Sequence, residues 1–200
     1  MKKTVFLFAL ITLLCASCSS SKASIEGKKM EKSEQQKLAE AKPAVRAWGE
    51  ATQFNQSFAK TYAEGQARAE FARKLATLVQ TASRQATDGA DLAHSDGEYS
   101  SQGHDQGITS NAFAQQVADG LVSGLTVIST DTYKLKYGQY HVFVCMECQG
   151  SVDMLASEMT KNYRQRVEQQ VSDEDRAKME VRYEEFRKSI EEQLKRLQGN

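Results

Sequence analysis

Two cysteines three residues apart are the clearest candidates for chemistry in this chain. Cys145 and Cys148 have the C-x-x-C spacing of thiol oxidoreductases and of half a zinc site. A redox pair needs its first thiol at a helix N-terminus, where the helix dipole lowers the thiol pKa, but Cys145 falls in a predicted strand. A zinc site needs two more ligands, and the chain has no second C-x-x-C. The spacing therefore predicts a disulfide or two buried thiols, with redox or metal chemistry as the alternative.

Acidic and histidine side chains gather in a second segment, residues 88–110, which is rich in Gly, Ser and Asp. Their spacing does not follow the calcium-binding pattern D-x-[DN]-x-[DN]-G. The segment also lacks a helical or strand period, which predicts a long solvated loop rather than a metal site. The candidate ligands in it are Asp88, Asp91, His94, Asp96, His104 and Asp105, and the third histidine, His141, lies elsewhere.

The common catalytic motifs are missing from the sequence. It contains no P-loop, no H-E-x-x-H and no G-x-G-x-x-G. Ser123 lies between two glycines at the wrong spacing for a nucleophile elbow. We therefore predict a protein that is not an enzyme and has no catalytic residue, metal or cofactor.

A third cysteine, Cys18, stands where lipid attachment is expected. Behind a short basic start, Val5–Leu14 is an apolar run too short to span a bilayer but suited to a signal peptide. The small residues Ala16 and Ser17 before Cys18 resemble the bacterial lipobox, although Cys15 stands where that motif usually has Leu. The pattern predicts cleavage after residue 17 and a lipid-modified Cys18, and an ordinary cleaved signal peptide is the alternative.

The residues after Cys18 predict where the anchored protein goes. Ser19, rather than Asp, follows the modified residue and resembles lipoproteins that are sent to the outer membrane. The next residues contain no acidic cluster of the kind seen in some surface-export signals, which favours the periplasmic face. We expect the lipid to be the contact with the membrane.

Charge argues against a nucleic-acid partner. The chain has 26 basic and 26 acidic residues, and loss of Lys2 and Lys3 with the signal peptide leaves a formal charge of about −2. A chain with this balance produces no strong field to hold phosphates. Its single proline and its many Ala, Glu, Gln, Lys and Arg residues favour helix.

The N-terminal half predicts a linker, a strand and a long helix. Residues 18–42 are polar, which predicts a lipid-anchored linker, transiently helical after Lys29. Val45–Ala51 alternates in polarity and predicts a strand. From Ser57 to Thr87 apolar residues recur at steps of three or four, which predicts an alanine-rich helix, and Gly65 within it predicts a close contact. The predicted stripe is Phe58, Tyr62, Ala69, Ala72, Leu75 or Ala76, Val79, Ala82 and Ala86.

The remaining chain predicts a hairpin between helices. A second helix is expected at 111–124, followed by antiparallel strands at 125–136 and 139–149. In the second strand, side chains of both faces include apolar residues, which predicts a central strand covered on each side. After residue 151 come two helices, the last opening near Ser172. Its apolar stripe needs a partner, either the preceding helix or sheet, or a second molecule in a coiled coil. That stripe is Met179, Tyr183, Phe186, Ile190, Leu194 and Leu197.

Three of these segments carry a family resemblance. They are Arg46–Gly49, the helix segment Ala63–Ala76, and the hairpin strands Val127–Lys136 and Gln139–Met146. In this order, after a lipobox, they resemble the Lpp-twenty-type outer-membrane lipoprotein family, with a likeness to the N-terminal domain of flagellar assembly protein T. The resemblance covers about half of the chain. It implies a small α+β domain in envelope or flagellar assembly, and it supplies no catalytic residue.

We therefore predict an α+β protein in which a small antiparallel sheet, one N-terminal strand plus a hairpin, packs on the long helix and is followed by a C-terminal helical extension. The expected divisions are a signal peptide (1–17), the anchored linker (18–42), an α+β domain (43–150) and C-terminal helices (151–200). The expected role is a non-enzymatic interaction or assembly module that binds an envelope protein or its own copies through the C-terminal helices. A ligand-binding module, with a pocket between sheet and helix, and a thiol-active protein are the alternatives.

Overall fold

The computed structural model describes residues 31–93, 108–169 and 173–199. Nearly all of these belong to one compact unit, Lys32–Asn200, and Met1–Glu31 is a separate unit. The predicted signal peptide and Cys18 therefore lie outside the described residues, as do residues 94–107 of the predicted loop. No boundary between compact units falls at residue 150, so the C-terminal helices are part of the same unit as the sheet.

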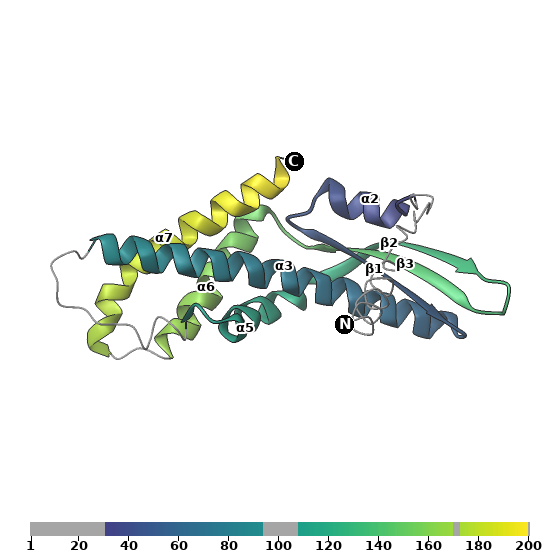
Figure 1. Ribbon diagram of the computed structural model, residues 1–200, viewed down its shortest axis with the longest axis horizontal. Helices are drawn as coiled ribbons and strands as arrows, with labels where there is room; N and C mark the ends of the chain where they lie inside the picture. Colours follow the sequence, from purple (N-terminus) through teal and green to yellow (C-terminus); the bar gives the residue numbers. More distant parts are fainter. Residues whose placement is uncertain (1–30, 94–107, 170–172, 200) are drawn as a thin grey trace, which may run out of the picture. The chain divides into compact units, whose positions relative to one another are not determined.

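The sheet is three-stranded and antiparallel, with the order β1-β3-β2 (Figure 1). β1 is Arg46–Gln53, β2 is Leu125–Lys134 and β3 is Tyr140–Cys148. The predicted strand and hairpin are thus confirmed, and β3 is the central strand. One face of the sheet carries the small and branched side chains of Ala47, Val142 and Val144, and the register places Gly49 opposite Val144 on this face. These side chains belong to the hydrophobic core.

The long helix α3, Gln56–Ala93, packs directly beneath β1. A Cβ on Gly49 would lie 2.2 Å from the carbonyl oxygen of Ala63 and 2.6 Å from the amide nitrogen of Ala67, so only glycine allows this approach. The buried residues of α3 near this contact, Ala59, Ala63 and Ala67, are small for the same reason. Further along α3 the buried positions include the larger residues Phe71, Leu75 and Val79 as well as Ala82 and Ala86.

This packing corrects two predictions about α3. The stripe was expected to begin with Phe58 and Tyr62, but their exposed fractions are 64% and 60%. The alanines one position further along the helix face the sheet instead, because aromatic rings would not fit between two backbones in contact. Gly65 was expected at a close contact, but a Cβ there would meet nothing within 4 Å, and the close contact is at Gly49.

The opposite face of the sheet is partly covered by α2, Glu34–Ala41 (Figure 1). Ser33 caps this helix by accepting a hydrogen bond from the Gln36 amide at 3.1 Å. Gln35 is buried, and its side-chain amide donates to the Asp131 carboxylate at 2.8 Å. The C-terminal third of the predicted linker is therefore a helix that packs on the sheet, because Gln35 and Ala39 on one side of it are buried there.

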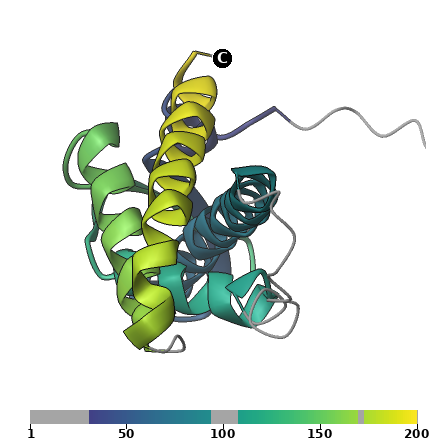
Figure 2. The ribbon, with the colours of Figure 1, turned by 90° about the vertical axis from the view of Figure 1, so that its left-hand side faces the viewer.

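A helical layer packs against α3. α5 (Asn111–Val122) and α7 (Asp173–Gln198) contact α3 directly, whereas α6 (Val152–Glu168) packs on α5 and α7, and Figure 2 shows α7 between α6 and α3. Ser110 and Ser151 cap α5 and α6 through their hydroxyl oxygens. The predicted helices are confirmed, and α3 extends to Ala93, so its last turns occupy the start of the segment that was expected to be a loop.

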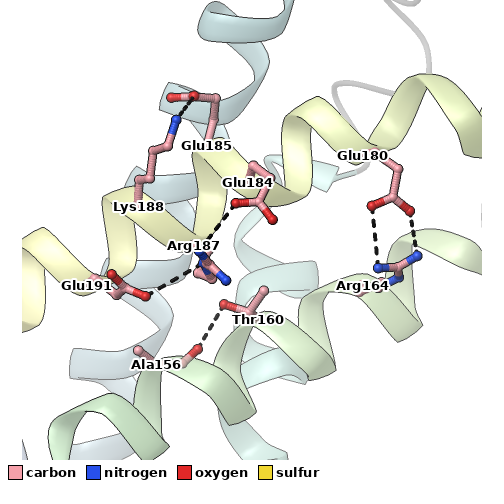
Figure 3. A network of polar contacts seen from close by, with 9 residues as sticks. All are labelled: Ala156, Thr160, Arg164, Glu180, Glu184, Glu185, Arg187, Lys188 and Glu191. Carbon is pink, nitrogen blue, oxygen red and sulfur yellow. Dashed lines mark hydrogen bonds and ion pairs between the residues drawn. The ribbon is translucent and has the colours of Figure 1, made fainter.

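Aromatic rings hold the helical layer together. The rings of Tyr163 on α6 and Phe186 on α7 stack with centroids 3.8 Å apart, and Phe113 on α5 meets Tyr163 edge to face at 5.6 Å. Ion pairs flank these rings at the surface, among them Arg164 and Glu180, which link α6 to α7 at 2.5 Å (Figure 3). Such exposed pairs add about 0–1 kcal/mol each, so ring burial dominates the stability of this layer.

Candidate functional site

The two cysteines of the C-x-x-C pattern lie on opposite faces of β3. Side chains alternate along a strand, so positions three apart point away from each other. Cys145 is fully buried, Cys148 is partly buried, and both are free thiols. Burial raises the pKa of each thiol, and Glu147 adds to this effect. The structure therefore brings the two sulfur atoms neither to a disulfide nor to a shared site.

The candidate metal ligands, for which the sequence favoured a solvated loop instead, form no metal-binding group within the described part of the chain. Asp88 and Asp91 fall in the last turns of α3, and His94, Asp96, His104 and Asp105 lie outside the described residues. His141 is on β3 and its imidazole lies 3.4 Å from the Glu50 carboxylate on β1. Among the described residues, no group of three or more metal-binding side chains is present.

The apolar stripe of α7 is already occupied within the chain. Phe186, Ile190 and Leu194 are fully buried, and α7 packs along α3 and α6. The sequence offered the preceding helix or the sheet, or a second molecule, as the partner; the structure places the preceding helix α6 against α7, together with α3, which was not among these candidates. The stripe is therefore no free docking surface.

A free surface is found at the outer edge of β1. Val45 accepts a hydrogen bond from the Cys148 amide, so the odd-numbered residues of β1 direct their backbone groups toward β3. Those of Trp48, Glu50 and Thr52 point the other way. No strand among the described residues pairs with them, because β1 is an edge strand of the sheet. Further along this edge, the Arg46 carbonyl accepts from the Lys74 ammonium at 3.2 Å.

A groove of about 560 Å³ runs beside this edge. One wall is β1 and the other is the flank of α3, where the Arg73 guanidinium pairs with the Glu70 carboxylate at 2.6 Å. Burial of Lys74, one position after Arg73 on α3, lowers the pKa of its ammonium group despite the nearby carboxylate of Glu70. The lining residues are Trp48, Gly49, Glu50, Gln66, Ala69, Glu70 and Arg73.

Exposed aromatic side chains continue the same flank of α3. Phe58, Tyr62, Gln66 and Ala69 follow one another at steps of four, four and three, which places them along one side of the helix. Phe54, just before α3, has 71% of its surface exposed. We call the free edge of β1, the groove and these three aromatic residues the β1 edge surface. The helical period predicts Phe58 and Tyr62 in the core, so the β1 edge surface was not found from the sequence. The small residues of β1 were nevertheless a signal for close helix packing.

The other edge of the sheet is protected. In β2 the register shifts between Val127 and Ser129, so Ile128 forms a bulge. A bulge disrupts the regular spacing that an added strand needs, and natural proteins use it to block edges. β1 pairs with β3 in an unbroken register from Arg46 to Gln53. The outer edge of β1 is therefore better suited to pairing with an added strand than the outer edge of β2.

Comparisons with known proteins do not assign this chain to a family. No protein-family model matches the chain, and no curated protein or solved structure matches it either. The Lpp-twenty-type resemblance consequently stays a prediction. Among the helices of the described ranges, none is both long and apolar enough to cross a membrane.

Proposed function

We propose that this chain is a lipid-anchored outer-membrane lipoprotein whose folded unit is a non-enzymatic interaction or assembly module of the cell envelope. The anchor is supported by the apolar run before Ala16, Ser17 and Cys18. The observation that carries the interaction role is the β1 edge surface, where exposed aromatic rings lie beside unpaired backbone groups. Such groups on an exposed edge are a known template for polypeptide binding.

This proposal moves the docking surface away from the C-terminal helices. Their apolar stripe is buried against α3 and α6, so removal of residues 171–200 would expose the helical layer as well as any partner site. The alternative of a ligand pocket between the sheet and α3 is not favoured, because Gly49 and Ala63 are in direct contact there. The β1 edge surface is an open groove on the outside of this contact.

Mass spectrometry of the processed protein tests the anchor. We expect a mature chain that begins at Cys18 and carries acyl groups, and a Cys18→Ala variant that leaves the membrane fraction or stays unprocessed. A single acyl chain binds a bilayer with only about 10⁴ M⁻¹, so the expected two- or three-chain modification makes attachment effectively permanent. An unmodified mature terminus would remove the membrane part of the proposal.

Photo-crosslinking in cells tests the interaction role. A photoreactive residue in place of Tyr62 should yield a discrete crosslinked protein. The same residue at Glu192, an exposed position of α7, is the matched control. Equal products from both positions, or none from Tyr62, would argue against a specific partner at the β1 edge surface.

A further inference from the structure

We propose that the β1 edge surface binds an extended segment of another polypeptide as a fourth strand of the sheet. This inference rests on the proposed interaction role and specifies its partner. The added strand would lie outside β1, giving the order new strand-β1-β3-β2. Its partner is defined by chemistry: a stretch of chain in strand conformation with small apolar side chains at alternate positions.

Backbone complementarity is the first argument. Trp48, Glu50 and Thr52 each present an N–H donor and a C=O acceptor at the free edge, spaced two residues apart as in any antiparallel or parallel ladder. Only another polypeptide in strand conformation offers donors and acceptors with the same repeat. The ladder supplies affinity, whereas the side chains of the added strand supply specificity.

The groove defines which side chains fit. Every second side chain of an added strand would point to the α3 side of the sheet. There it would meet Ala69 and the aliphatic part of Gln66, with the Glu70–Arg73 ion pair at the far wall. A branched apolar side chain of moderate size fits this lining. The remaining side chains would lie beside Trp48 and Glu50 on the opposite face.

The partner is not supplied by the chain's own unplaced segments. Residues 19–30 contain only Ala23, Ile25 and Met30 as apolar side chains, and residues 94–107 contain one hydrophobic side chain, Tyr99. Ala23 and Ile25 alternate, but the alternation stops there, so neither segment offers a run of more than two apolar side chains at alternate positions. The strand must therefore come from another molecule.

A second copy pairing through its own β1 does not fit either. Two-fold pairing that continues the sheet would put both copies of α3 on the same face, with the strands about 4.8 Å apart. The α3 flank already reaches beyond the β1 edge, since Gln66, Ala69 and Arg73 form the outer wall of the groove. Packed helices need about 8–10 Å between their axes, so the second helix would occupy the groove itself.

The test uses the only tryptophan of the chain as its reporter. Trp48 lines the groove, so strand binding should change its fluorescence. The probe is the end-capped octapeptide Lys-Thr-Val-Thr-Val-Thr-Val-Lys, added to the full processed protein in detergent. A second peptide with the same sequence carries N-methyl groups on alternate amides, and it cannot form the ladder. We expect a saturable signal with the first peptide and at least about tenfold weaker binding of the second, since ladder hydrogen bonds are lost.

Matched variants locate the binding. Glu50→Pro removes an amide that points away from β3, so β1 keeps its pairing, and proline is tolerated on such an edge. Glu50→Ala loses the same carboxylate but keeps the amide. Ala69→Arg fills the groove, and Ala112→Arg on the exposed face of α5 is its control. We expect Glu50→Pro and Ala69→Arg to weaken binding about tenfold and the controls less than about threefold.

The outcomes separate this inference from the proposed function. No saturable signal, or equal affinity for the two peptides, overturns strand addition. Equal affinity of the Ala69→Arg and Ala112→Arg variants for the first peptide also overturns strand addition. This comparison remains valid even where the Glu50→Pro variant does not fold. A dimer in sedimentation that Ala69→Arg dissociates would assign the surface to a second copy instead. A specific crosslink at Tyr62 without peptide binding would leave the interaction role standing and remove the strand.

Discussion

At the scale of single residues, Gly49 sets how closely the long helix approaches the sheet. Gly49→Ala places a Cβ 2.2 Å from a backbone oxygen of α3, so the helix or the strand must move. We expect the free energy of unfolding to fall by about 3 kcal/mol, the upper end for overpacking in a core. Urea denaturation of the two proteins measures this difference.

Gly65→Ala is the matched control for that substitution. It adds the same methyl group in an exposed turn of α3, where no atom lies within 4 Å. We expect it to raise the free energy of unfolding by about 0.5–1 kcal/mol, since alanine favours helix over glycine. A similar loss of stability in both variants would contradict the close contact at Gly49.

The buried thiol of Cys145 predicts a pH effect on stability. Burial raises its pKa, so the folded protein holds this proton at pH values where the unfolded chain has released it. The contribution is complete below the unfolded thiol pKa of about 8.5, and it is lost as pH rises toward the raised folded value. We expect the free energy of unfolding to fall above that pH and Cys145→Ala to reduce the decline. A decline unchanged by the substitution would assign it to other groups.

At the scale of elements, α7 is held by its aromatic contact with α6. Phe186 is fully buried and stacks on Tyr163. We expect Phe186→Ala to lower the free energy of unfolding by about 3–5 kcal/mol. Val181→Ala, on the same helix at 40% exposure, should change it by no more than about 0.5 kcal/mol. Near-equal effects in chemical denaturation would mean that α7 does not pack as described.

The sequence predicted which elements form better than which faces they bury. Alternation in Val45–Ala51 and the 3.6-residue period of α3 and α7 are local signals, and the corresponding elements are present. Burial depends on the partner that each element meets. The exposure of Phe58 follows from the contact of Gly49 with Ala63, which lie on two different elements, so the period of α3 alone does not show it.

The candidate site was harder to predict than the fold for the same reason. Cys145 and Cys148 attracted attention by their spacing, but strand geometry separates them onto two faces. The β1 edge surface has no sequence motif. It arises because β1 is at the edge of the sheet, which depends on β3 rather than β1 lying in the middle. The apolar residues on both faces of β3 did predict that this strand lies in the middle, but no pattern in β1 or α3 shows which exposed side chains lie beside the free edge of β1.

At the scale of the whole unit, α3 joins the sheet and the helical layer. It packs beneath β1 and also on α5 and α7, so neither layer keeps its core if α3 unfolds. We therefore expect one cooperative transition in urea. Trp48 fluorescence reports the sheet and circular dichroism reports mostly the helices, so the two curves should coincide. Separate midpoints would show that the two layers unfold independently.

The place of α2 decides how the unit responds to mechanical load. Tension applied along the N-terminal segment reaches Ser33 and α2 before it reaches the sheet. This short helix is held by few polar contacts, chiefly the bond from Gln35 to Asp131, and it can peel away one contact at a time. The tension would reach β1 and α3 only after α2 has detached. We therefore expect α2 to detach first, which would uncover the sheet face on which Cys145 lies while the core beneath stays intact.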